Sequence, residues 1–137
     1  MSTERQQATG DRRQATGDAL RKGADIAERL LELGVGILRL VRTLPRDVAG
    51  RHVAAQLIRC STSGGANYEE ARAAESRADF IHKLGIAAKE LRETSFWLRL
   101  VQKASMTPTN VDALIHRTAE LTAILIASSR TARRNAE

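Results

Sequence analysis

The chain has few cysteines, prolines and aromatic residues, and these shortages exclude several classes of protein. Cys60 is the only cysteine in 137 residues, which excludes an internal disulfide scaffold and a cysteine-based structural zinc site. One Trp, one Tyr and two Phe residues are too few for extensive base-stacking platforms, which disfavours sequence-specific recognition of single strands. No apolar run approaches the roughly 18 residues of a membrane span, and the polar N-terminus lacks the apolar stretch of a secretory signal. We therefore expect a soluble, cytoplasmic protein without a membrane segment.

Helix-forming residues are abundant. Apolar residues make up 42% of the chain, enough for the core of one domain, and Ala, Leu and Arg are its commonest residues. Apolar positions recur at steps of three and four along four segments, a spacing typical of packed amphipathic helices. The pattern predicts an all-α fold, an antiparallel up-down four-helix bundle with long helices at about 19–44, 47–75, 77–105 and 108–134.

Capping residues and prolines mark the expected helix boundaries. Asp18 and Asp47 can cap the first two helices, and Ser76 opens a capping box at the third. Pro108 suits the first turn of the fourth helix. In the second helix Gly64-Gly65 either bends the helix or breaks it, and we expect a continuous or slightly bent helix.

The first 18 residues differ from the rest. They contain no Leu, Ile, Val or aromatic residue, and the element Gln-Ala-Thr-Gly-Asp occurs at 7–11 and again at 14–18. This composition predicts a disordered or flexible tail at 1–18, ahead of a bundle domain at 19–137. The alternative is a tail that becomes ordered on a partner.

No combination of residues matches a known catalytic or metal site. A di-iron bundle needs Glu-x-x-His elements, and the nearest match, Asp79 with His82, is a single shortened one. The nucleophiles around Cys60 have no evident base, and the segment with Gly64-Gly65 lacks the lysine of a phosphate loop. We therefore predict no catalytic residues, no metal, no cofactor and no enzymatic activity.

Four polar residues lie on or beside the apolar faces of the second and third predicted helices. We predict an interhelical network that sets helix register, formed by Asn67, Glu70, Glu90 and Glu93. The alternative is a small polar pocket at the same residues, which would belong to an enzyme of unrecognised type.

Positive charge is concentrated in two regions. The chain carries 22 Lys and Arg residues against 16 Asp and Glu residues, a net charge of +6, and 18 of the cations are Arg. The guanidinium group suits phosphate, so the clusters together predict binding to a nucleic-acid backbone, although an ordinary solvated surface is the better explanation of any one Arg. In an antiparallel bundle the two clusters lie at opposite ends. The candidate nucleic-acid-binding residues are Arg39, Arg42, Arg46, Arg51, Arg59, Arg130, Arg133 and Arg134.

The middle of the chain resembles a known family. Residues 56–71 contain Asn67-Tyr68-Glu69-Glu70-Ala71, and residues 76–98 contain Lys89-Glu90-Leu91-Arg92-Glu93-Thr94-Ser95-Phe96-Trp97-Leu98. Together these elements resemble the four-helix-bundle proteins encoded in 23S rRNA intervening sequences, over about residues 25–130. The resemblance implies a homopentamer without established enzymatic activity. A related branch comprises the accessory variability proteins of diversity-generating retroelements, basic pentamers that engage a reverse transcriptase and nucleic acid; the basic C-terminus looks like that branch.

These observations predict a non-catalytic, oligomeric accessory protein that binds RNA or DNA through basic surface residues. The wide apolar face of the first helix also favours self-association. The alternative is a protein-interaction scaffold, for example a reverse-transcriptase accessory subunit, without direct nucleic-acid binding.

Overall fold

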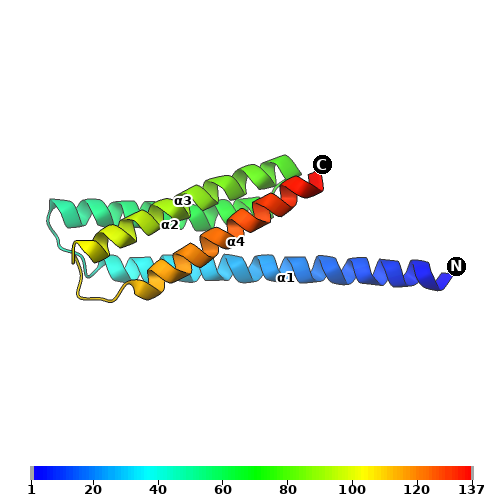
Figure 1. Ribbon diagram of the computed structural model, residues 1–137, viewed down its shortest axis with the longest axis horizontal. Helices are drawn as coiled ribbons and strands as arrows, with labels where there is room; N and C mark the ends of the chain where they lie inside the picture. The colour runs from blue at the N-terminus through cyan, green and yellow to red at the C-terminus, as the bar shows by residue number, and fades with distance from the viewer. Residues whose placement is uncertain (1, 137) are drawn as a thin grey trace.

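The computed structural model describes residues 2–136 and consists of four helices joined by short links (Figure 1). The helices are α1 (Ser2–Val41), α2 (Val48–Arg72), α3 (Arg77–Lys103) and α4 (Asp112–Ala136). Consecutive helices run in opposite directions, and no strand occurs among the described residues. The predicted all-α, up-down four-helix bundle is confirmed.

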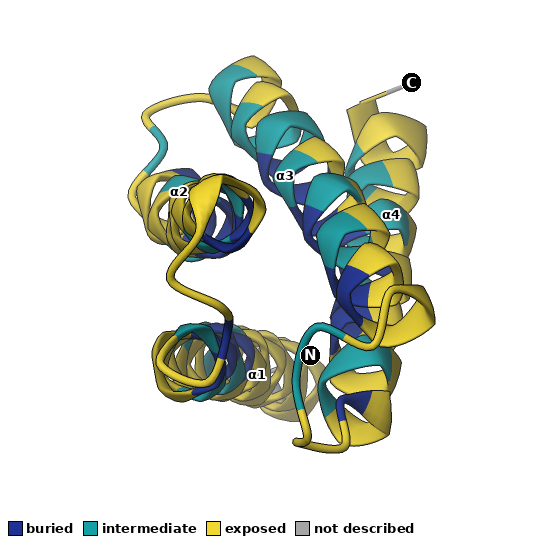
Figure 2. Cartoon of the chain, turned by 90° about the vertical axis from the view of Figure 1, so that its left-hand side faces the viewer, coloured by how far each residue is buried: buried dark blue, intermediate teal, exposed yellow. Residues whose placement is uncertain are grey.

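The core is a column of aliphatic side chains between the helices. Each helix packs against two others, α1 with α2, α2 with α3, α3 with α4, and α4 with α1. The end-on view shows buried residues on the inward sides of the helices (Figure 2). Burial of each large apolar side chain contributes about 1.5–3 kcal/mol, so this column dominates the stability. Its fully buried members include Leu30, Leu33, Ile37, Leu57, Leu84, Leu91, Leu98, Leu121 and Leu125.

Helix α1 begins well before the predicted position. It is helical from Ser2, and its first half extends past the other helices (Figure 1). Asp18 is therefore not an N-cap; it forms an ion pair with Arg21 inside the helix. Ala, Gln and Arg favour this extension despite Gly10 and Gly17, but its side chains from 3 to 16 are exposed and bury no apolar surface. The structure thus shows helix where we expected disorder, and the division into a tail and a bundle domain stays a prediction.

The predicted N-cap residues of α2 and α3, Asp47 and Ser76, are confirmed, but among the described residues no return bond from the Ser76 N–H to the Asp79 carboxylate completes the predicted capping box. The Asp47 carboxylate accepts a hydrogen bond from the Gly50 amide at 2.8 Å, and the Ser76 hydroxyl accepts one from the Asp79 amide at 3.1 Å. These bonds satisfy amides that have no partner within the helix.

The predicted start of α4 is wrong. Pro108 lies in the α3–α4 link, and α4 begins at Asp112, whose amide donates to the Asn110 side chain at 2.9 Å. The link leaves α3 through Ser105, which has a left-handed backbone (φ 51°). The buried side chain of Val111 anchors the end of the link before α4 begins.

Helix α2 is continuous through Gly64-Gly65, as expected. A Cβ atom on Gly64 would lie 2.9 Å from Leu91 Cδ2, so the glycine allows α3 to approach α2 closely. This contact explains why a residue of low helix propensity occupies a helix interior.

Candidate nucleic-acid interface

The first arginine cluster surrounds the link between α1 and α2. Arg39 lies in the last turn of α1, Arg42 and Arg46 lie in the link, and Arg51 follows the first turn of α2. All four side chains are exposed, and none forms an ion pair within residues 2–136. The structure therefore brings together four arginines whose donors face solvent.

The start of α2 adds to this positive potential. A helix N-terminus carries a partial positive charge, and acidic residues there are stabilising whereas cations are not. The first turn of α2 has no acidic residue, and only the capping Asp47 offsets Arg46 and Arg51. These cations are therefore not explained by helix stability, and their position suits an anion such as phosphate.

Arg59 is engaged differently from the other four. It lies farther along α2 and forms ion pairs across to α3, with Glu90 at 3.2 Å and with Glu93. Two carboxylates neutralise its charge, so Arg59 serves the α2–α3 contact. Arg59 is among the predicted nucleic-acid-binding residues because the sequence does not show which cation faces which acid.

The second cluster lies at the other end of the bundle. Arg130, Arg133 and Arg134 are exposed on the last two turns of α4. Their positive charge is stabilising at the negative end of the helix dipole. This end of α4 lies far from the α1–α2 link (Figure 1). The up-down topology separates them from the α1–α2 link, as expected.

The predicted polar network does not form as one unit. The Asn67 side-chain amide donates within its own helix, to the Ser63 carbonyl at 2.9 Å, and is joined to none of the predicted acids. Glu70 pairs with Lys83 at 2.7 Å, which raises the pKa of the Lys83 ammonium. Asn67 is only partly buried and a preceding carbonyl lies within reach, so it does not require an interhelical partner.

The buried polar contact between α2 and α3 lies elsewhere. The Thr94 hydroxyl lies 3.1 Å from Cys60 Sγ and donates to the Glu90 carbonyl at 2.9 Å. Burial raises the pKa of the Cys60 thiol, so the sulfur stays protonated and unreactive at neutral pH. Thr94 and Cys60 therefore act as core residues.

Helix α3 carries a basic face that was not predicted from the sequence. Lys89, Arg92, Arg99 and Lys103 are exposed and, within residues 2–136, form no ion pair. Their steps of three, seven and four residues place them on one side of the helix. The spacing of these four cations is visible in the sequence. Only the structure shows that they have no acidic partner among the described residues.

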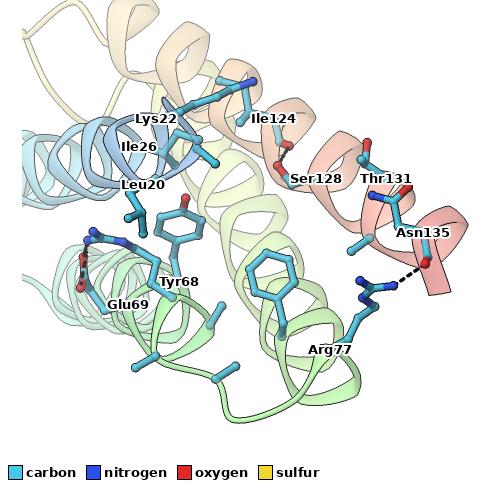
Figure 3. Close-up of a pocket in the computed structure, with 18 of the residues that line it drawn as sticks. Leu20, Lys22, Ile26, Tyr68, Glu69, Arg77, Ile124, Ser128, Thr131 and Asn135 are labelled. Carbon is cyan, nitrogen blue, oxygen red and sulfur yellow. Dashed lines mark hydrogen bonds and ion pairs between the residues drawn. The ribbon is translucent and has the colours of Figure 1, made fainter. Parts of the chain in front are cut away.

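An open cavity of about 1180 Å³ lies between α1 and α4 beside the α2–α3 link (Figure 3). Tyr68 lines it and is 5% exposed, with a hydroxyl that forms no hydrogen bond to another described residue. Burial raises the pKa of the Tyr68 phenol, so the group stays neutral. The remaining wall combines apolar residues such as Ile26 and Phe80 with polar and charged ones, including Lys22 and Glu69, and Arg77 is bonded to the Asn135 carbonyl. The Ser76 hydroxyl accepts from the Asp79 amide, and the Ser128 and Thr131 hydroxyls donate to carbonyls of α4, so these three hydroxyls are engaged by the backbone.

A second, apolar groove of about 650 Å³ runs between α1 and α2. Leu31 is 62% exposed there, and Val35 and Leu38 extend the same face. Small residues of both helices, including Gly34 and Gly65, leave space in the groove for another side chain or helix. This exposed face is the outer stripe of the wide apolar surface seen in the sequence.

Among the described residues no group of three or more His, Cys, Asp or Glu side chains could hold a metal ion. None of the four helices, over the part of the chain described, is both long and apolar enough to cross a membrane.

The four packed helices define a helical-bundle protein with basic clusters at both ends. The chain belongs to the family described as 23S rRNA-intervening sequence protein, whose model matches residues 22–127. It is similar to the crystal structure of a protein of unknown function from the S23 ribosomal protein family of Bacteroides thetaiotaomicron VPI-5482, with 34% identity and a TM-score of 0.71. That match covers 80% of this chain and 98% of the other. Comparison with curated proteins yields no match.

Proposed function

We propose that this protein is a non-catalytic, oligomeric accessory protein that binds nucleic acid through its basic surface. The observation that carries the proposal is the link cluster, which we define as Arg39, Arg42, Arg46 and Arg51. These arginines gather at one end of the bundle around a helix N-terminus, with no acidic partner among the described residues. Such an arrangement favours phosphate groups over a neutral or cationic ligand.

Self-association would multiply this weak site. The exposed Leu31, Val35 and Leu38 form an apolar face that a monomer leaves in water, and covering it would be favourable. A homopentamer, as the family resemblance implies, would present five link clusters to one nucleic acid and raise the affinity through avidity. Light scattering tests this part: an oligomer supports it, and a monomer at micromolar concentration contradicts it.

A salt titration with structured RNA tests nucleic-acid binding. The variant Arg42→Gln/Arg46→Gln/Arg51→Gln removes three link-cluster charges, and Arg5→Gln/Arg12→Gln/Arg13→Gln removes three from the exposed N-terminal extension. Each lost phosphate contact lowers the slope of log affinity against log salt by about 0.7–0.9. We expect the slope of log affinity against log salt to fall by about two in the link variant. The extension variant should bind as wild type does. Absence of wild-type binding at low salt would refute the proposal.

The alternative is a protein-interaction scaffold, such as an accessory subunit of a reverse transcriptase. The apolar groove between α1 and α2 favours it, because a partner helix could occupy that groove instead of another subunit. Affinity capture with nuclease treatment separates the two functions. A specific partner that survives nuclease and is lost in Leu31→Asp supports the scaffold, whereas a partner released by nuclease supports nucleic-acid binding.

A further inference from the structure

Three rings form a row across the outer surface of α2 and α3. His52 of α2 meets Trp97 of α3 edge to face, with ring centroids 5.6 Å apart, and Trp97 meets Phe96 in the same manner at 5.0 Å. Phe96 ends the row and is 57% exposed. The sequence contains few aromatic residues, but the fold gathers two of them and a histidine in one place.

The basic face of α3 surrounds the exposed end of this row. Arg92 and Arg99 lie four residues before and three residues after Phe96, and Lys89 and Lys103 lie seven residues away on either side. These separations place all four cations on the same side of the helix as Phe96. At about 1.5 Å per residue the basic face is about 20 Å long.

The two acidic residues of α3 closest in sequence to Phe96 are engaged in ion pairs. Glu90 and Glu93 lie on the side of α3 that faces α2, where both bind Arg59. Their negative charge is therefore partly compensated, and the cations beside Phe96 keep an attractive potential for anions.

Core packing does not account for Phe96. The neighbouring Trp97 packs against the core, and its indole N–H is buried without a hydrogen-bond partner among the described residues. Phe96 instead keeps more than half of its surface in water, held in orientation by the Trp97 ring. A fixed, exposed ring between cations is suited to stacking on a flat apolar ligand that carries negative charge.

We propose that the Phe96 ring and the basic face of α3 bind single-stranded nucleic acid. An unpaired base would stack on Phe96, while Lys89, Arg92, Arg99 and Lys103 contact the flanking phosphates. A duplex keeps its base faces stacked internally, so this surface favours unpaired strands. The proposal rests on the proposed nucleic-acid function and adds a site and a substrate class. It also revises the expectation that too few aromatic residues occur for stacking.

Trp97 provides a direct signal for the test, because it is the only tryptophan. Six-nucleotide oligo-uridylate and oligo-thymidylate would be titrated against the full-length protein, with a matched duplex as the third probe. We expect both single strands to change the Trp97 fluorescence and to bind more tightly than the duplex. Equal affinity for the two single strands indicates stacking and phosphate contacts alone, whereas preference for oligo-uridylate indicates an added contact to the 2′-hydroxyl; both support the proposal.

Variants separate stacking from charge. Phe96→Ala should weaken single-strand binding roughly 5- to 100-fold, as expected for loss of one stacked base, while Phe96→Tyr retains the ring and should bind as wild type. Arg92→Gln/Arg99→Gln should lower the salt slope for single strands by about 1.4. Arg12→Gln/Arg13→Gln removes the same charge from the N-terminal extension and is the matched control.

Circular dichroism and light scattering establish that each variant keeps its fold and its oligomeric state. Wild-type binding that is unchanged in Phe96→Ala and Arg92→Gln/Arg99→Gln overturns the α3 site but leaves the proposed function intact. A Phe96→Ala protein that dissociates into subunits also overturns it, because the ring would then belong to a protein interface. Failure of wild type to bind any nucleic acid at low salt would remove the proposed function and this site together.

Discussion

Gly50 is the position where a single methyl group should be most damaging. It lies in the first turn of α2, directly over the α1–α2 link, and its amide binds Asp47. A Cβ atom on Gly50 would overlap the Pro45 carbonyl oxygen and lie 2.7 Å from the carbonyl carbon. These are backbone atoms, so no side-chain rotation can relieve the overlap and the link itself must move.

The magnitude follows from the rigidity of the neighbour. Overpacking of a well-packed site costs about 1–3 kcal/mol, and the upper end applies because the clash is with the main chain. We therefore expect Gly50→Ala to lower the free energy of unfolding by about 3 kcal/mol, which corresponds to a fall in Tm of roughly 10 °C for a chain of this size. Because the link cluster is attached to the displaced segment, RNA affinity should fall as well.

Gly85→Ala is the matched control for this prediction. Gly85 also lies in a helix, but no atom lies within 4 Å of a Cβ built on it. Replacing it should stabilise the protein by about 0.5–1 kcal/mol, because alanine has the higher helix propensity. Urea denaturation followed by circular dichroism, at one protein concentration, measures both variants. Equal free energies of unfolding for Gly50→Ala and Gly85→Ala would refute the steric argument.

Three further predictions concern the core and the titrating groups. Leu98→Ala should lower the free energy of unfolding by about 2–5 kcal/mol, measured by urea denaturation, because the side chain is fully buried. A decrease below about 1 kcal/mol would contradict its place in the core. Cys60 should react with a thiol reagent only after unfolding, since burial raises the pKa of its thiol, and rapid labelling of the native protein would contradict this. The Lys83–Glu70 pair should stabilise the fold below the ordinary Lys pKa of 10.5, and this stabilisation should be lost as pH rises through the raised pKa of Lys83. Lys83→Met should remove this pH dependence of the urea midpoint.

Local features of the chain could be predicted from the sequence. The apolar repeat predicted four helices, and Asp47 and Ser76 were identified as caps because a cap depends only on the next three residues. The placement of Arg46 and Arg130 at opposite ends followed from the up-down order of the helices alone. The misplaced starts of α1 and α4 have local causes too. Helix propensity outweighed the lack of apolar residues before Asp18, and the Asn110 side chain, rather than Pro108, supports the start of α4.

The helical class, the helix order and the two arginine clusters follow from the amino-acid sequence, because each depends on spacing within a segment or on chain direction. The pairing of Arg59 with Glu90 and Glu93, the bond of Asn67 within its own helix and the contact of His52 with Trp97 depend on the packing of the helices. Which side chains meet across two helices depends on how far each helix is rotated about its axis and on how closely the pair can approach. At Gly64 that approach is set by the Leu91 side chain of another helix, a contact that no single segment encodes.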